Sequence, residues 1–201
     1  MNLPNKVTTL RFILSIIYFV LLYFSIKDIQ KTEYINKPIL TIGLIIFIIA
    51  ALSDVLDGYL ARKYNASTQF GRIADPFVDK ILICGSFVFF LGWGSMHDFI
   101  GSWMVLLVIV REFLVHGLRT IAEAKGISFG ANIWGKQKTM IQCFTIMWGL
   151  AYLLYFKDLS EYWWTATILH SLIWLTLFTT VFSAFTYFYK IRKMLRTVVD
   201  E

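Results

Sequence analysis

Residues 54–79 read DVLDGYLARKYNASTQFGRIADPFVD, and this stretch lies between two long apolar segments. It carries four carboxylates within 26 residues: Asp54, Asp57, Asp75 and Asp79. Four like charges beside a bilayer are costly unless positive charge holds them together. Oxygen ligands without cysteine or histidine suit Mg²⁺ or Mn²⁺ and disfavour zinc. We therefore expect two divalent cations, either Mg²⁺ or Mn²⁺, to bind here.

The spacing within this stretch predicts two helix ends joined by a short loop. Four residues follow the i, i+3, i+4, i+7 spacing of one helix stripe: Asp54, Asp57, Gly58 and Ala61. Asp75 and Asp79 are one turn apart on the following helix, and Asp75 before Pro76 also fits an N-cap at the start of that helix. Residues 63–70 are short and polar, which is typical of a loop. All four carboxylates can therefore point into one pocket.

The composition around this stretch is that of an integral membrane protein. Hydrophobic residues make up 58 % of the 201 residues and charged residues only 16 %, where a soluble domain has roughly a quarter. Six apolar runs are long enough to cross a bilayer as helices: Phe12–Ile26, Pro38–Leu52, Pro76–Trp93, Phe99–Ile121, Thr139–Phe156 and Thr165–Phe188. Cys84 and Cys143 fall inside these runs, so no disulfide framework is expected. We predict an all-α integral membrane protein with six transmembrane helices in a single domain, residues 1–201.

The basic residues predict the orientation in the membrane. Only four of the 19 Lys and Arg residues fall on the side opposite the aspartates: Lys27, Lys31, Lys37 and Lys157. The positive-inside bias therefore places both termini and the aspartate stretch in the cytoplasm. The net charge of +6 indicates contact with anionic membrane lipid on that side, and no soluble basic face of the kind that binds nucleic acid is visible. Since no signal peptide or organelle leader precedes the first run, we expect a bacterial plasma (inner) membrane.

At the aspartate stretch the chain resembles the CDP-alcohol phosphotransferase family, whose motif D-x2-D-G-x2-A-R-x8-G-x3-D-x3-D it matches at every position. The resemblance implies a homodimeric six-helix membrane enzyme that transfers the phosphatidyl group of a CDP-linked lipid to an alcohol and releases CMP. It implies that the four aspartates hold the two metals and that Asp79 also takes the proton from the attacking hydroxyl. It further implies a CDP-lipid site made of Asn5, Thr8, Gly58, Ala61, Arg62, Thr68 and Gly71. On chemical grounds, residues without bulk let a ligand approach the backbone, and the Arg62 guanidinium suits a pyrophosphate.

The charged residues of the fourth apolar run bear on the identity of the acceptor alcohol. Glu112, His116 and Arg119 share one helix stripe, and Arg111 lies on a neighbouring face. A structural Glu112–His116 hydrogen bond is one interpretation, and a pocket for a phosphate-bearing acceptor is the other. Several stretches resemble the phosphatidylglycerophosphate synthase branch of the family: residues 2–11, 111–113, 117–119, 135–139 and Gln142. That resemblance implies CDP-diacylglycerol and sn-glycerol 3-phosphate as substrates, with the acceptor phosphate bound by Arg111, Arg119, Lys136 and Lys138.

Three other functions remain open on the sequence. One is a sister enzyme of the same family, such as a CDP-dependent cardiolipin synthase or a phosphatidylinositol phosphate synthase. Another is a divalent-cation transporter, although its acidic residues should follow a route across the membrane, whereas these four lie at one level. The third is a non-catalytic membrane scaffold, in which the polar residues serve only helix packing. An assay for CMP release separates these functions.

Overall fold

The described part of the chain folds into six long helices and two short helical segments. The computed structural model describes residues 3–32, 35–64, 69–124, 133–157 and 163–199. The elements are α1 (Leu3–Thr32), α2 (Lys37–Tyr64), α3 (Gln69–Phe90), η1 (Gly94–Met96), α4 (Ser102–Ala124), α5 (Ile133–Ala151), η2 (Tyr152–Phe156) and α6 (Trp163–Val199). Within these ranges there is no β-strand, so the predicted all-α class is confirmed.

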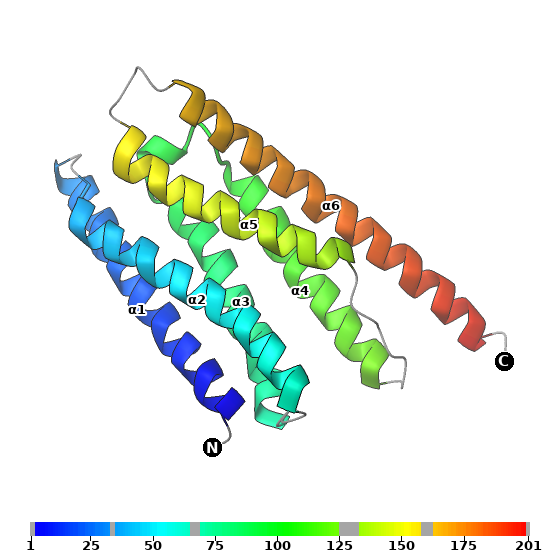
Figure 1. Cartoon of the computed structure of the whole chain (residues 1–201). Helices are drawn as coiled ribbons and strands as arrows, with labels where there is room; N and C mark the ends of the chain where they lie inside the picture. The colour runs from blue at the N-terminus through cyan, green and yellow to red at the C-terminus, as the bar shows by residue number, and fades with distance from the viewer. Residues whose placement is uncertain (1–2, 33–34, 65–68, 125–132, 158–162, 200–201) are drawn as a thin grey trace.

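Successive long helices run in opposite directions, as Figure 1 shows. One end of the bundle holds the start of α1, the connected ends of α2 and α3, the connected ends of α4 and α5, and the end of α6. The opposite end holds the short segments η1 and η2. Both termini and the two helix ends that carry the aspartate stretch therefore lie at the same end of the molecule.

The first three helices pack through aromatic and small residues. Tyr18 of α1 is fully buried, its ring centroid lies 5.5 Å from that of Phe47 in α2, and its hydroxyl lies 3.0 Å from the Ser86 hydroxyl in α3. Gly85 of α3 lies directly against Phe19 of α1, because a Cβ at this glycine would be 2.4 Å from the ring. The close approach of α1 to α3 thus depends on a residue without a side chain.

The fifth helix is held between α3 and α6. The hydroxyls of Thr145 in α5 and Thr176 in α6 lie 2.8 Å apart. On its α3 side, a Cβ at Gly149 would be 2.8 Å from the ring of Phe90, so the two helices approach closely there. These contacts fix the position of α5, which carries Lys138 nearer its start.

The six predicted helices are confirmed, with two points to note at their ends. As expected from the aspartate stripe, α2 continues past Leu52 to Tyr64. However, α3 begins at Gln69 rather than at Pro76, so the interpretation of Asp75 as an N-cap is wrong. Polarity alone does not end a helix. Pro76 lacks a backbone N–H donor and its ring crowds the preceding turn, yet α3 includes the seven residues before it. The connection between the two helices is accordingly shorter than predicted.

Two segments of the described chain are long and apolar enough to cross a membrane: Gly135–Phe156 and Trp163–Tyr189. Shorter apolar segments lie in α1, α2 and α3. The fourth helix carries three charged residues over a span length, Arg111, Glu112 and Arg119, so it does not meet the same criterion. Large hydrophobic side chains are nevertheless exposed along α1, α4 and α6. Six helices are therefore confirmed, and two of them have the composition of membrane spans.

Candidate active site

The four aspartates lie on the two helices that are connected at the end of the bundle holding both termini (Figure 1). Asp54 and Asp57 stand ten and seven residues before the end of α2, and Asp75 and Asp79 stand six and ten residues after the start of α3. At 1.5 Å per residue, all four are about 9–15 Å from the connected helix ends. Because the helices are antiparallel, the four positions have similar depths in the bundle. Their side chains lie outside the described residues.

The described side chains therefore do not test the predicted metal site. Among them, no group of three or more His, Cys, Asp or Glu is placed to hold an ion, and the four aspartates are outside that set. The donor chemistry of the aspartate positions is purely carboxylate oxygen, which suits Mg²⁺ or Mn²⁺. The backbone positions are compatible with a shared site, because both helices present their aspartates at the same depth.

The positions predicted to line the CDP-lipid site lie at the same end of the bundle. Six of the seven are placed on helices: Asn5 and Thr8 in α1, Gly58, Ala61 and Arg62 in α2, and Gly71 in α3. Thr68 lies outside the described residues, as do the side chains of the other six. The fold thus brings the backbone of three helices, each with part of the predicted site, to one end of the molecule.

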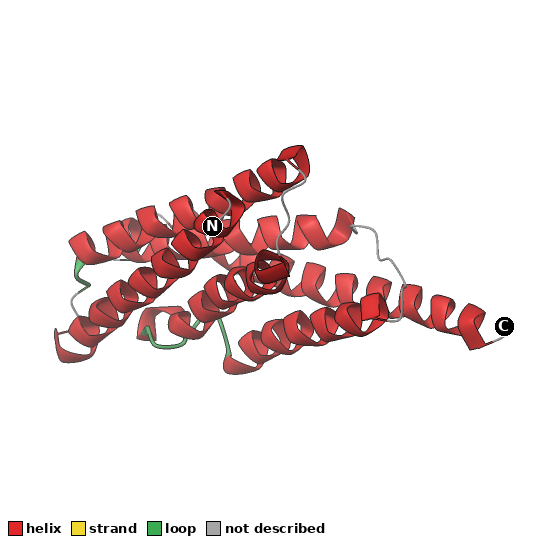
Figure 2. Cartoon of the chain, turned by 90° about the horizontal axis from the view of Figure 1, so that it is seen from below, coloured by secondary structure: helices red, strands yellow, loops and turns green. Residues whose placement is uncertain are grey.

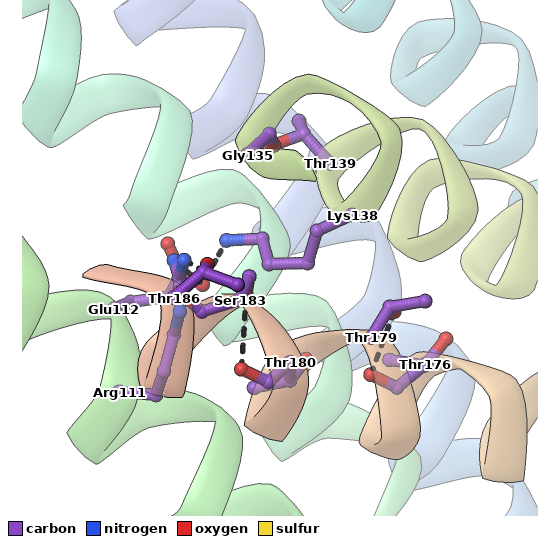
Figure 3. A network of polar contacts seen from close by, with 10 residues as sticks. All are labelled: Arg111, Glu112, Gly135, Lys138, Thr139, Thr176, Thr179, Thr180, Ser183 and Thr186. Carbon is purple, nitrogen blue, oxygen red and sulfur yellow. Dashed lines mark hydrogen bonds and ion pairs between the residues drawn. The ribbon is translucent and has the colours of Figure 1, made fainter. Parts of the chain in front are cut away.

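A buried network of polar side chains joins α4, α5 and α6 (Figure 3). Glu112 Oε1 accepts hydrogen bonds from Arg111 Nη1, at 3.1 Å, and from Lys138 Nζ of α5. Arg111 Nη2 donates to Ser183 Oγ of α6 at 2.9 Å, and Ser183 donates to the carbonyl of Thr180 at 2.9 Å. Arg111, Glu112 and Lys138 are each no more than 9 % exposed. The network is therefore an interior feature of the bundle.

Two cations surround one carboxylate in the described part of this network. Arg111 and Lys138 are cations and share the single carboxylate of Glu112, so the formal charge of the three is +1. The Nε of Arg111 is buried and has no partner among the described atoms. Buried charge is costly unless it is paired and hydrogen-bonded. Two buried cations around one carboxylate therefore favour the approach of an anion.

The structure brings together two of the four residues predicted to bind the acceptor phosphate. Arg111 and Lys138 meet at Glu112, whereas Arg119 and Lys136 have exposed side chains nearer the end of the bundle. The ring of His116 packs edge-on against Phe77, with centroids 5.6 Å apart. The hydrogen bonds described for Glu112 run to the two cations, so this carboxylate is an element of the basic cluster.

Two residues of interest were not singled out from the sequence. Arg11 of α1 is only 1 % exposed, and it stands just before an apolar run. A charged residue so close to a membrane segment is a signal that could have identified it. Ser183 is one of many hydroxyl residues in α6, and no sequence pattern links it to Arg111, 72 residues earlier.

Comparison with known proteins identifies the family. The family profile described as CDP-alcohol phosphatidyltransferase matches residues 1–184, a range that includes the whole aspartate stretch and the Arg111–Glu112–Lys138 network. The chain belongs to the CDP-alcohol phosphatidyltransferase family. It is therefore a phosphatidyltransferase enzyme, and the resemblance that the aspartate motif indicated is confirmed.

Relatives of this phosphatidyltransferase are similar along most or nearly all of their length. A protein of Bacillus subtilis (strain 168) named CDP-diacylglycerol–glycerol-3-phosphate 3-phosphatidyltransferase is 35 % identical over 199 residues, which cover 98 % of each chain. A protein of Rickettsia bellii (strain RML369-C) with the same name is 33 % identical over 193 residues, 96 % of each chain. A third, of Wigglesworthia glossinidia brevipalpis, is 32 % identical over 159 residues, 77 % of this chain and 81 % of the relative.

Proposed function

We propose that this phosphatidyltransferase transfers the phosphatidyl group of CDP-diacylglycerol to sn-glycerol 3-phosphate, giving phosphatidylglycerophosphate and CMP. Relatives that are similar over almost their whole length are named for these two substrates. The structural observation that favours this acceptor is the buried Arg111–Glu112–Lys138 network, in which two cations share one carboxylate. A neutral acceptor such as inositol gains little from that charge, whereas a phosphate dianion is stabilised by it.

In the proposed reaction, the free primary hydroxyl of glycerol 3-phosphate attacks the phosphorus that is bonded to the diacylglycerol. The bond between this phosphorus and the bridging oxygen breaks, and CMP leaves with the electron pair. Asp79 accepts the proton of the attacking hydroxyl. A positioned general base of this kind accelerates a reaction by about 10²–10⁴-fold.

Asp54, Asp57, Asp75 and Asp79 would hold the two divalent cations, Mg²⁺ or Mn²⁺. When bound, these ions supply positive charge that stabilises the transferring phosphoryl group and the departing CMP. The four aspartates offer only carboxylate oxygens as donors and lie at similar depths on α2 and α3, and both features support this assignment.

The remaining predicted residues divide between the two substrates. Around the CDP group, Gly58, Ala61 and Gly71 would leave room for the ligand against the helix backbone, and Arg62 would bind the pyrophosphate. Asn5, Thr8 and Thr68 complete this site. For the acceptor, Arg119 and Lys136 are exposed at the end of the bundle and would meet the phosphate first, while Arg111 and Lys138 would attract it inward.

The proposal places the enzyme in the bacterial inner membrane as a homodimer, with all six helices crossing the bilayer. The exposed hydrophobic side chains of α1, α4 and α6 support contact with lipid. Both termini and the active site would face the cytoplasm, since 15 of the 19 Lys and Arg residues fall on that side. This arrangement lets a membrane-bound donor meet a water-soluble acceptor.

The test is release of CMP from CDP-diacylglycerol by the purified protein. We expect release to require glycerol 3-phosphate and either Mg²⁺ or Mn²⁺, to stop with EDTA, and to be lost in Asp79→Asn. Asp98→Asn is the matched control, because Asp98 is exposed at the opposite end of the bundle. Release that depends on phosphatidylglycerol or inositol phosphate instead would assign the protein to another branch of the family and refute the proposed acceptor.

A further inference from the structure

A groove of about 240 Å³ runs between α4 and α6 on the outside of the bundle. Its walls are formed by apolar residues of both helices, among them Leu107, Val110 and Leu114 of α4 and Val181, Ala184 and Phe185 of α6. Phe185 is 69 % exposed, so the groove opens toward the surroundings of the bundle. Large apolar concavities on a protein surface mark sites of interaction.

The groove reaches the level at which the apolar part of α6 ends. Phe188 is the last of its described lining residues on α6, and Tyr189 is the last apolar residue before Lys190. Tyrosine at the end of a span is typical of the headgroup level of a membrane. The 37 residues of α6 measure about 55 Å, well over a hydrocarbon core of about 30 Å. Figure 2 shows its C-terminal end extending from the bundle.

Basic residues follow directly on the same face of α6. Val181, Phe185, Phe188 and Arg192 follow the i, i+4, i+7, i+11 spacing of one stripe, and Arg196 is one turn further. The side chain of Arg192 is exposed. It stands about 6 Å along the helix axis from Phe188. An apolar groove of the cytoplasmic half thus leads into positive charge at headgroup level.

We propose that the α4–α6 groove binds one acyl chain of an anionic diacyl phospholipid of the cytoplasmic leaflet, with the lipid phosphate at Arg192 and Arg196. The apolar lining fits a hydrocarbon chain, and the two arginines provide the complementary charge. This lipid is distinct from the CDP-lipid substrate, since the groove is lined by α4 and α6, whereas the predicted CDP-lipid positions lie on α1, α2, α3 and the α2–α3 connection.

A lipid chain in the groove would also contact the polar network. Arg111 forms part of the groove wall while its guanidinium bonds to Glu112 and Ser183. A hydrocarbon chain in the groove therefore packs against the outer side of this arginine and helps to hold α4 against α6. The proposal depends on α6 crossing the membrane and is independent of which acceptor the enzyme uses.

The experiment measures lipids retained by the delipidated and re-lipidated protein in native mass spectrometry. The mixture contains equal amounts of dioleoylphosphatidylglycerol and dioleoylphosphatidylcholine. Wild-type protein should retain phosphatidylglycerol preferentially. Ala184→Phe fills the groove and should abolish retention, whereas Ala166→Phe adds the same volume on α6 outside the groove and should not. Thermal unfolding of both variants shows whether they are folded.

A second pair of variants tests the charges. Arg192→Gln with Arg196→Gln should lower the preference for phosphatidylglycerol roughly tenfold or more, since each basic residue near a membrane surface adds to anionic-lipid affinity. Lys37→Gln with Lys157→Gln removes two charges at the opposite end and should leave the preference unchanged.

Several outcomes would overturn this assignment. Equal retention of the two lipids by the wild type would remove the role of the arginines. Equal lipid retention by Ala184→Phe and Ala166→Phe would show that the lipid does not bind in the groove. A changed number of protomers in Ala184→Phe would show that a second copy of the chain occupies it, and a raised KM for CDP-diacylglycerol would assign it to the substrate. A wild type that fails to use glycerol 3-phosphate but retains the lipid as expected would refute only the proposed acceptor.

Discussion

Replacing Glu112 by glutamine should destabilise the protein, because this carboxylate holds two buried cations. Its Oε1 is bonded to Arg111 Nη1 at 3.1 Å and to Lys138 Nζ, and these residues belong to two different helices. All three side chains are buried, so water cannot solvate the two cations once the carboxylate is lost. Glutamine keeps the volume and one oxygen acceptor but removes the negative charge. The formal charge of the network would rise from +1 to +2.

The structure sets the expected size of this effect. Removing one partner of a buried ion pair costs about 3–5 kcal/mol, whereas an exposed pair contributes about 0–1 kcal/mol. Because glutamine still accepts a hydrogen bond, we expect a value near the lower limit, about 3 kcal/mol. For a chain of 201 residues this corresponds to a fall of the unfolding midpoint by about 6–12 °C.

The assay is thermal unfolding of purified protein in micelles, compared with denaturant unfolding where the transition is reversible. Asp98→Asn is the control and should change the free energy of unfolding by less than about 0.5 kcal/mol, since its side chain is exposed. In a double-mutant cycle, Lys138→Met should recover part of the stability lost in Glu112→Gln, because it removes one of the two cations that Glu112 contacts. A loss below about 1 kcal/mol, or strictly additive single effects, would refute the described pairing.

Three further predictions concern catalysis and packing. Asp79→Asn should lower kcat for CMP release by about 10²-fold or more without changing the unfolding midpoint, and a residual rate near wild type would exclude it as the base. Arg119→Ala should raise KM for glycerol 3-phosphate about tenfold and leave KM for CDP-diacylglycerol unchanged; equal effects on both would contradict its role. Gly85→Ala should lower the free energy of unfolding by about 1–3 kcal/mol, because the added Cβ would contact the ring of Phe19. Gly94→Ala is the control and should have little effect in the same measurement, because a Cβ at Gly94 would contact no atom within 4 Å.

The number and order of the helices were predictable because polar residues separate each apolar run from the next. Hydrophobic runs reveal the central part of a helix, where burial decides the structure, but not its ends. The extension of α2 to Tyr64 was correctly predicted, since the aspartate stripe continues the helical period. The start of α3 was not, because residues 69–75 mix polar and apolar types and Pro76 resembles the first residue of a helix. Helix ends depend on competition among local interactions that composition does not resolve.

The polar network shows a different limit of sequence reasoning. The spacing of Glu112 and Arg119 places them on one stripe of α4, yet Glu112 is buried and Arg119 is exposed. Helical periodicity defines which residues share a face, but the neighbouring helix that covers each level of that face depends on tertiary packing. The bond from Lys138 to Glu112 spans 26 residues and that from Arg111 to Ser183 spans 72. Only the fold could bring these groups together.

The charge count of this network bears on why the acceptor should carry a phosphate. With a second carboxylate beside Arg111, the cluster would have equal numbers of cations and anions, and its charges would be paired without a ligand. Here one carboxylate serves two cations, and the Nε of Arg111 has no described partner. Two buried cations around one carboxylate favour a phosphate dianion over a neutral alcohol. Arg119 and Lys136 are exposed between this cluster and the end of the bundle, so binding of the acceptor should weaken as ionic strength rises. A KM for glycerol 3-phosphate that does not increase with salt would contradict the electrostatic argument for a phosphate-bearing acceptor.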